Sequence, residues 1–417
     1  MKSVGVLELP SDIVKEVLSR PTVFRDEGPL SLEYVPTHLP HRDDKLSFLV
    51  QLFRFALEKP ASMSQRVLIT GDVGTGKTVL CQRFGLDITK AAKNRKVNLH
   101  YVHVNCRENK GSLFLIMKRA IEKLSPDFPK RGFAPEELLQ VLMDMLDDQN
   151  AHLILALDEL ESLIQTEGSS PIYTLTRIQE ERPGAPMRLS LICILREPEY
   201  LAKLDASASG TLQRNFVRLD KYAPNQLQTI LSDRVELAFK EGTMPETTVS
   251  FLADVVGSSG DARYAIELLW RSGKYADSES SRMVSAEHVR KAIASVYPAM
   301  RTDYIAALSI HEKLFLLALS RLLIERDAGY VSMGDVERQY QSSCDEFNEE
   351  PRQHTQLWKY VRSLSSIGVI SAQKSGEGMR GRTTLLGFSQ VPASAMQQSL
   401  EAVLESARKI SRRYQDI

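Results

Sequence analysis

The chain has 417 residues, and its 53 lysines and arginines balance 53 aspartates and glutamates. This length supports roughly two to four domains, and 43% apolar with 25% charged residues excludes a globally disordered chain. A net charge of zero excludes a uniformly basic nucleic-acid coat but allows a local basic patch. No apolar run approaches the ~18 residues that span a bilayer. Residues 1–10 lack a secretory signal pattern, so we expect a cytoplasmic protein without a membrane partner.

The first half of the chain alternates short apolar runs with helical patterns. Residues 1–40 are a lead-in punctuated by prolines, and a helical pattern begins at His41. Strands that alternate with helices indicate a parallel sheet with helices on its faces, so we predict an α/β core over residues 1–223. The predicted strands are 66–70, 100–105, 152–158, 189–195 and 216–219.

The strongest motif directly follows the first predicted strand. Residues 71–78 read GDVGTGKT and match the Walker A pattern G-x-x-x-x-G-K-[ST], with a helix predicted after them. Glycines let backbone N–H groups turn toward phosphate oxygens, and the helix N-terminus adds positive potential. Lys77 would reach the β- and γ-phosphates, and the Thr78 hydroxyl would ligate Mg²⁺. The alternative is a glycine-rich turn before a helix. We predict nucleotide contacts from Gly71, Asp72, Val73, Gly74, Thr75, Gly76, Lys77, Thr78 and Val79.

Two acids follow the third predicted strand. Asp158 would hold Mg²⁺ through water, and Glu159 would orient or deprotonate the attacking water. By themselves, two acids after a strand can also be a helix cap and a first-turn charge. Combined with the phosphate motif, they predict ATP or GTP binding but do not establish rapid hydrolysis. Lys77, Asp158 and Glu159 are the catalytic candidates, and Thr78 with Asp158 is the Mg²⁺ candidate.

Strands stop after Pro224, and two further blocks follow. Residues 224–300 have the pattern of four helices. Residues 301–417 show helices, then two short strands around a turn, then an amphipathic terminal helix. This order describes a winged helix. Its helices are predicted at 311–323, 332–347, 352–366 and 393–413, and its strands at 369–372 and 383–386.

Positive charge is concentrated in the third helix and the wing. Residues 351–382 hold six basic side chains and one acid, whereas residues 335–350 hold six acids and one base. Leu357, Val361 and Leu364 share one face of the third helix, which should pack inward. The opposite face and the wing would then contact duplex DNA, unless the winged helix binds protein and its basic face is only solvated. The predicted DNA contacts are Arg352, Thr355, Lys359, Arg362, Lys374, Arg380 and Arg382.

The order of these parts resembles the archaeal origin-recognition/cell-division-cycle initiator family of AAA+ ATPases, over about residues 20–392. Gly260-Asp261-Ala262-Arg263 in the helical block, Tyr34-Val35-Pro36 near the N-terminus and Asn105-Cys106-Arg107 are similar to that family's signatures. The resemblance implies an AAA+ P-loop core (1–223), an all-α lid (224–300) and a C-terminal winged helix (301–417). It also extends the expected nucleotide contacts to Tyr34, Val35, His41, Arg42, Tyr222 and Arg263. By spacing alone, Arg263 could equally be a surface residue.

The resemblance further implies ATP-dependent binding to duplex origin DNA and help in recruiting or loading the replicative helicase. Partners would be origin DNA, paralogous initiator subunits and the helicase, on the nucleoid. A family-specific helical insertion would fall near 127–146, and Lys130 and Arg131 in its turn would contact DNA. The alternatives are an ATP-switched winged-helix transcription regulator, a signal-transduction ATPase, or a helicase-loader adaptor that binds protein.

The sequence departs from the family pattern at two positions. Arg196 stands where the family has a polar residue, usually Asn, and it either reaches the γ-phosphate or faces solvent. Ser207 stands where the family has a trans-acting arginine. Because an arginine finger is worth roughly 10³–10⁵ in rate, we expect slow ATPase activity at most, with tight retention of ATP or ADP.

Overall fold

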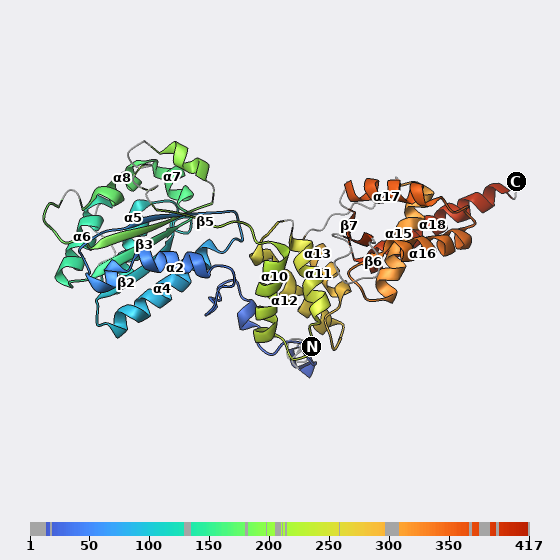
Figure 1. Cartoon of the computed structure of the whole chain (residues 1–417), viewed down its shortest axis with the longest axis horizontal. Helices are drawn as coiled ribbons and strands as arrows, with labels where there is room; N and C mark the ends of the chain where they lie inside the picture. The colour runs from blue at the N-terminus through green and yellow to red at the C-terminus, as the bar shows by residue number, and fades with distance from the viewer. Residues whose placement is uncertain are drawn as a thin grey trace, which may run out of the picture. The chain divides into compact units, whose positions relative to one another are not determined.

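The chain forms two compact units, drawn with the whole chain in Figure 1. One unit comprises Glu33–Gln226 with Ser259–Ala262, and the other comprises Met1–Leu32, Leu227–Ser258 and Arg263–Ile417. Among the described residues, no helix is both long and apolar enough to cross a membrane. This computed structural model describes residues 14–16, 19–128, 135–179, 182–196, 198–204, 210, 212, 215–257, 259–296, 308–366, 369–374, 384–388 and 392–415.

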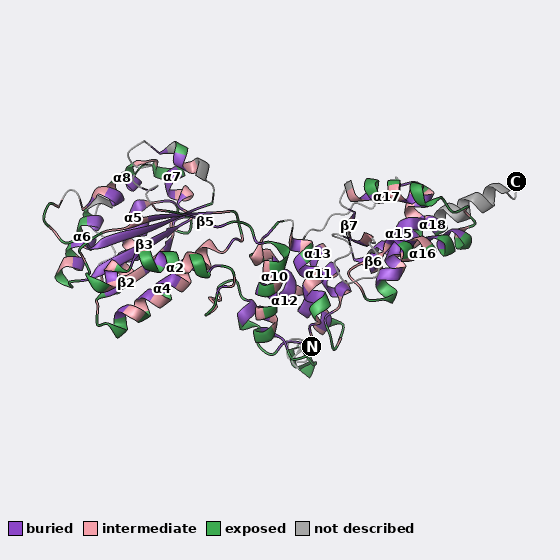
Figure 2. Ribbon diagram, viewed as in Figure 1, coloured by how far each residue is buried: buried purple, intermediate pink, exposed green. Residues whose placement is uncertain are grey.

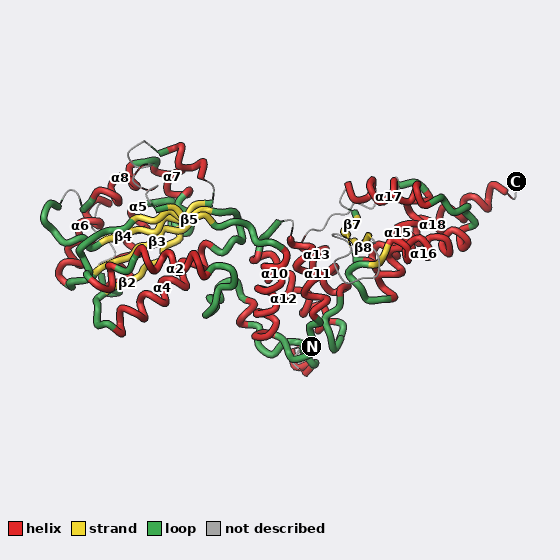
Figure 3. Tube along the Cα trace, viewed as in Figure 1, coloured by secondary structure: helices red, strands yellow, loops and turns green. Residues whose placement is uncertain are grey.

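A five-stranded parallel sheet forms the centre of the first unit (Figure 3). Its strand order is β2-β3-β4-β1-β5, which brings the carboxyl ends of β1 and β3 to the same edge. Asn105 at the end of β2 pairs with Asp158 at the end of β3. The predicted strands and the α/β class are confirmed. The strands are β1 (Arg66–Thr70), β2 (Leu99–Asn105), β3 (His152–Asp158), β4 (Leu189–Leu195) and β5 (Phe216–Arg218).

Helices cover both faces of this sheet, and its strands are buried throughout most of their length (Figure 2). Side chains alternate along β3: Leu153, Leu155 and Leu157 pack with α5–α8, whereas Ile154 and Ala156 pack with α2 and α4. The helices are α2 (Asp43–Leu52), α3 (Phe55–Glu58), α4 (Lys77–Asn94), α5 (Leu113–Leu124), α6 (Pro135–Asp148), α7 (Glu161–Glu167), α8 (Ser170–Arg177) and the 3₁₀ helix η2 (Pro198–Lys203).

The helical block has the expected helices, and the lead-in packs against them. The Phe24 ring centroid lies 4.8 Å from that of Phe239, and the Arg25 N–H donates to the Ala238 carbonyl at 2.7 Å. Gly273 leaves room for Phe24, because a Cβ there would lie 2.2 Å from its ring. We expected the lead-in to belong with the core, whereas these contacts join it to the lid. The elements are η1 (Gly28–Leu30), α10 (Pro224–Ala238), α11 (Glu246–Gly257), α12 (Ala262–Ser278) and α13 (Ala286–Val296).

The C-terminal block is a winged helix with an antiparallel sheet of order β6-β8-β7. The predicted buried helix is confirmed as α15, and a short strand, β6, was not predicted because two residues carry no periodicity. The third helix begins at His354, two residues later than predicted, so Arg352 precedes it. The elements are α15 (Ile310–Glu325), β6 (Val331–Ser332), α16 (Met333–Phe347), α17 (His354–Ser366), β7 (Ile370–Lys374), β8 (Thr384–Phe388) and α18 (Ala393–Gln415).

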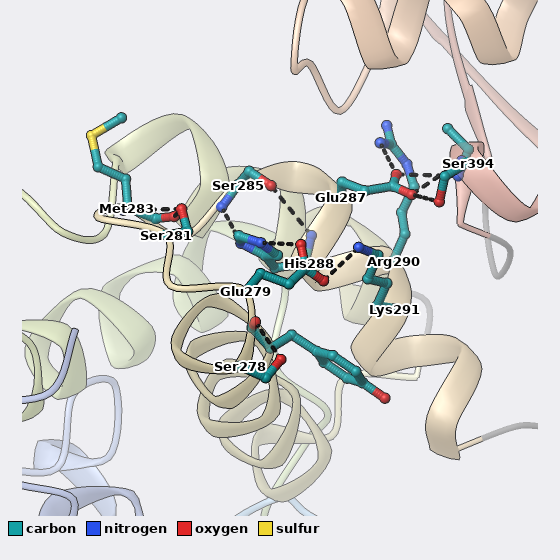
Figure 4. Close-up of polar contacts among 12 residues, drawn as sticks. Ser278, Glu279, Ser281, Met283, Ser285, Glu287, His288, Arg290, Lys291 and Ser394 are labelled. Atoms are coloured by element: carbon teal, nitrogen blue, oxygen red, sulfur yellow. Dashed lines mark hydrogen bonds and ion pairs between the residues drawn. The ribbon is translucent and has the colours of Figure 1, made fainter. Parts of the chain in front are cut away.

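Partly buried polar contacts join lid helix α13 to the winged helix (Figure 4). The Glu287 carboxylate accepts hydrogen bonds from the backbone N–H groups of Ala393 at 3.2 Å and Ser394 at 3.1 Å, the first residues of α18. Arg290 is 1% exposed, lies 3.3 Å from Glu287 and donates to two backbone carbonyls just before β6, at 2.6 and 3.2 Å. We call Glu287, Arg290, Ala393 and Ser394 the lid joint.

Candidate functional site

The loop from Gly71 to Thr78 connects the end of β1 to the first turn of α4. The backbone turns through left-handed conformations at Gly74 (φ 73°) and Gly76 (φ 90°), which glycine adopts without steric cost. A Cβ on Gly71 would lie 2.3 Å from the Leu219 carbonyl oxygen. Together with the N-terminus of the 18-residue helix α4, this backbone forms a cradle of the kind that binds phosphate groups.

The Lys77 ammonium lies over this loop. Its Nζ donates to the carbonyls of Gly71 at 2.5 Å and Asp72 at 2.8 Å. Burial lowers the pKa of Lys77, while the nearby Asp158 carboxylate acts in the opposite direction. The structure therefore holds a cation within the loop, where phosphate oxygens could replace the two carbonyl acceptors.

Asp158 ends β3 beside this loop and is 4% exposed. Its Oδ2 accepts from the Thr78 hydroxyl at 2.7 Å and lies 3.1 Å from His103 Nε2, while its Oδ1 accepts from the Glu159 N–H at 2.9 Å. Burial raises the pKa of Asp158, but hydrogen bonds from His103 and Thr78 outweigh this effect and lower it. Adjacent hydroxyl and carboxylate oxygens are the hard ligands that Mg²⁺ prefers, so Thr78 and Asp158 fit that ion.

Two further side chains at this edge were not predicted. His103 contacts Asp158, and Glu161 follows in the first turn of α7, where burial raises its pKa. Glu161 Oε2 is buried without a hydrogen-bond partner among the described residues. Burial is the main cause that lowers the pKa of Lys77 and raises that of Glu161, and the charge of the exposed Arg196 adds a smaller downward contribution to both pKa values. Ser207 lies outside the described residues.

Arg42 also contacts the phosphate loop. Its guanidinium donates to the carbonyls of Thr75 at 3.1 Å and Asp220 at 2.7 Å, and lies 4.0 Å from the Tyr222 ring centroid. The Tyr222 hydroxyl would be 3.0 Å from a Cβ placed on Gly76. Two of the expected nucleotide-contacting side chains therefore touch each other and the loop. In the same unit, Tyr34, Val35 and Val79 are half-buried and His41 is exposed.

The Gly-Asp-Ala-Arg segment also contacts the loop. The Ala262 N–H donates to the Gly74 carbonyl at 3.1 Å, and the Tyr222 N–H donates to the Gly260 carbonyl at 3.3 Å. A Cβ on Gly74 would lie 1.8 Å from an Asp261 carboxylate oxygen. Residues 260–262 thus contact the loop within the first unit, and Arg263 is the second residue of α12.

The third helix of the winged helix has the two faces that were predicted. Leu357, Val361 and Leu364 are buried in the winged-helix core. The opposite side exposes polar and basic side chains, as does the loop before the helix: Arg352, Thr355, Lys359 and Arg362. The remaining predicted DNA contacts fall outside the described residues, or have side chains outside them: Lys130, Arg131, Lys374, Arg380 and Arg382.

The structure combines three parts: a parallel sheet with a phosphate loop and an acidic strand end, a helical lid, and a winged helix. Together they define an AAA+ P-loop protein with a C-terminal winged helix. Family models match accordingly: an AAA domain at residues 62–194, a Cdc6 AAA+ ATPase-type lid domain at 228–294 and the CDC6 C-terminal winged helix domain at 303–398.

Individual relatives agree with this class. The chain is 37% identical over 385 residues to ORC1-type DNA replication protein 2 of Sulfolobus acidocaldarius. The aligned residues make up 90% of this chain and 92% of that protein. The crystal structure of Cdc6p from Pyrobaculum aerophilum matches with a TM-score of 0.80 and 28% identity, over 92% of this chain and 99% of that one. The Aeropyrum pernix ORC1 protein in complex with DNA shares the fold, with a TM-score of 0.60 and 24% identity over 93% and 98% of the two chains. The chain belongs to the ORC1/Cdc6 family of archaeal replication proteins.

Proposed function

We propose that this protein is an ATP-dependent initiator of DNA replication that binds duplex origin DNA and helps recruit or load the replicative helicase. One observation carries the proposal: a phosphate loop with Thr78 and Asp158 in contact occurs in the same chain as a winged helix whose α17 exposes basic side chains. The close relative in Sulfolobus acidocaldarius, an ORC1-type DNA replication protein, supports it. Paralogous initiator subunits would be its protein partners.

The nucleotide would be ATP or ADP, with its phosphates on the Gly71–Thr78 loop and next to Lys77. Thr78 and Asp158 would hold Mg²⁺, which when bound neutralises phosphate charge. Glu159 follows Asp158 directly and is the candidate for orienting the attacking water. Because Ser207 stands where the family has a trans-acting arginine, we expect slow hydrolysis and long retention of nucleotide.

DNA would be bound through α17. A helix fits the major groove of duplex DNA, and the exposed Lys359 and Arg362 would neutralise phosphates. Phosphate contacts carry no sequence information by themselves, so Lys359 and Arg362 would add affinity at every sequence. Arg380 and Arg382 would extend this surface onto the wing, and Lys130 and Arg131 would supply a second contact.

The decisive experiment measures the affinity of the full chain for an origin fragment and for a scrambled duplex across a series of salt concentrations, with ATP present. The double variant Lys359→Ala/Arg362→Ala should weaken binding to both duplexes and reduce the slope of log K against log [salt] by about 2, one unit per phosphate contact. A matched control, Lys93→Ala/Arg95→Ala, removes two exposed cations from the end of α4. Equal slopes for the two double variants would exclude α17 as the reading helix, and the absence of any duplex affinity would favour a protein-binding adaptor.

The nucleotide half of the proposal has its own test. Lys77→Ala should abolish retention of ATP and ADP, because the loop then loses its cation, while the circular dichroism spectrum stays unchanged. Retention of nucleotide by this variant would contradict the assigned site.

A genomic footprint confined to promoters, rather than to an origin, would favour a transcription regulator.

A further inference from the structure

We propose that His103 is a positioning residue for the magnesium site: it donates from Nε2 to Asp158, and Tyr101 fixes the imidazole form that makes this donation. The inference rests on the proposed nucleotide function, since it concerns how the same site is held ready for Mg²⁺. It assigns roles to two side chains of β2, a strand from which no site residue was predicted.

Two of the three contacts of the Asp158 carboxylate are made by the same oxygen. Oδ2 accepts from the Thr78 hydroxyl at 2.7 Å and lies 3.1 Å from His103 Nε2, whereas Oδ1 is occupied by the Glu159 N–H at 2.9 Å. Both side chains of the histidine–aspartate pair are largely buried, with 16% of His103 and 5% of Asp158 exposed. Water therefore has little access to replace His103 as a donor. With these three donors in place, the carboxylate plane is fixed with Oδ2 beside Thr78.

The other ring nitrogen of His103 also has a hydrogen-bond partner. Nδ1 lies 3.3 Å from the Tyr101 hydroxyl. We assign the Tyr101 hydroxyl as the donor and Nδ1 as the acceptor in this contact. A neutral imidazole that accepts at Nδ1 carries its proton on Nε2, the nitrogen that faces Asp158. The order of donation is thus Tyr101 to His103 to Asp158.

Neighbouring elements hold this pair of side chains in place. Lys123 on α5 donates to the His103 carbonyl at 2.6 Å, which anchors the strand at that residue. On α4, Gly85 makes room for Tyr101, because a Cβ at that position would lie 2.2 Å from the phenol ring. Such hydrogen bonds to a metal-binding carboxylate orient it, and removing one typically costs about 10–100-fold in metal affinity.

The test measures the affinity of the full chain for a fluorescent ATP analogue during a Mg²⁺ titration, and again in EDTA. His103→Phe removes the Nε2 donor but keeps a planar ring, so it should raise the Mg²⁺ concentration at half-maximal effect by about 10-fold or more. Affinity in EDTA should stay at the wild-type value. His103→Gln restores an N–H donor near the Nε2 position and should recover much of the loss. Tyr101→Phe should give a smaller shift in the same direction.

A matched control is His100→Phe. Because successive side chains of a strand point to opposite faces, His100 lies on the face of β2 opposite to His103.

The outcomes separate the two proposals. If the wild-type chain shows no Mg²⁺-dependent gain in ATP affinity, the nucleotide site itself is wrong. If the wild-type chain responds to Mg²⁺ but His103→Phe and Tyr101→Phe behave like His100→Phe, the positioning role is refuted. Equal weakening of His103→Phe with and without Mg²⁺ would make His103 a packing residue and also overturn the inference. Should His103→Phe not fold, Tyr101→Phe alone decides between a shifted and an unshifted Mg²⁺ midpoint.

Discussion

The lid joint should carry a large share of the stability of the contact between lid and winged helix. In the variant Glu287→Ala, the N–H groups of Ala393 and Ser394 lose their carboxylate acceptor, and the almost fully buried Arg290 loses its counter-charge. Removing one partner of a buried ion pair costs about 3–5 kcal/mol. Arg290 keeps two backbone carbonyl acceptors and the α18 amides are only partly buried, so we expect the lower end, about 3 kcal/mol.

Native-state hydrogen exchange of the amides in the first turn of α18 measures this loss directly, because local opening free energies set exchange rates. A change of about 3 kcal/mol corresponds to a roughly 150-fold faster exchange, at 1.4 kcal/mol per factor of ten. The control Glu405→Ala removes an exposed glutamate from the same helix and should change exchange by less than about 0.5 kcal/mol. Indistinguishable exchange in the two variants would refute the reasoning, since Glu287 would then contribute no more than a solvated carboxylate.

Three further outcomes follow from single residues. Burial lowers the pKa of His152 to about 4. As the pH falls below 6.5, His152 is therefore protonated in the unfolded chain before it is protonated in the folded one. Denaturant titrations should show the free energy of unfolding of the core falling by about 3 kcal/mol from pH 7 to pH 4, and His152→Gln should remove that slope. A hydrogen bond from Arg326 lowers the pKa of Asp335 to about 2. Its stabilisation is present above about pH 4 and lost toward pH 2, so Asp335→Asn should destabilise the winged helix by about 2 kcal/mol at pH 7 and little at pH 2, by the same titrations. Gly71→Ala places a Cβ 2.3 Å from the Leu219 carbonyl and should weaken nucleotide binding at least about tenfold, a change of 1.4 kcal/mol, in a fluorescence titration.

Local patterns were sufficient for much of the fold and for part of the site. The phosphate loop is predictable because its spacing, strand and helix are contiguous in the chain. The two faces of α17 are predictable because Leu357, Val361 and Leu364 repeat at helical spacing and are indeed buried. The ends of β1, β3 and β4 are predictable because apolar runs stop there.

Contacts between distant segments could not be read in this way. His103 contacts Asp158 only because β2 and β3 are neighbours in the sheet. The order of strands in a sheet cannot be predicted from local sequence patterns. Arg42 contacts the loop through the backbone carbonyl of Thr75 and also donates to that of Asp220, and backbone acceptors of this kind cannot be recognised from the sequence. The attachment of the lead-in to the lid depends on Phe24 meeting the space left by Gly273, again a tertiary match.

The lid joint has a consequence for chimaeras built from relatives. The carboxylate that caps α18 comes from Glu287, outside the winged helix itself. A graft that exchanges only residues 308–415 would pair the terminal helix of a relative with the α13 of this chain, and the contact between Glu287 and the first residues of that helix would not be matched. A graft that starts at Ala286 would transplant donor and acceptor together, and would be the safer way to exchange the winged helix between relatives.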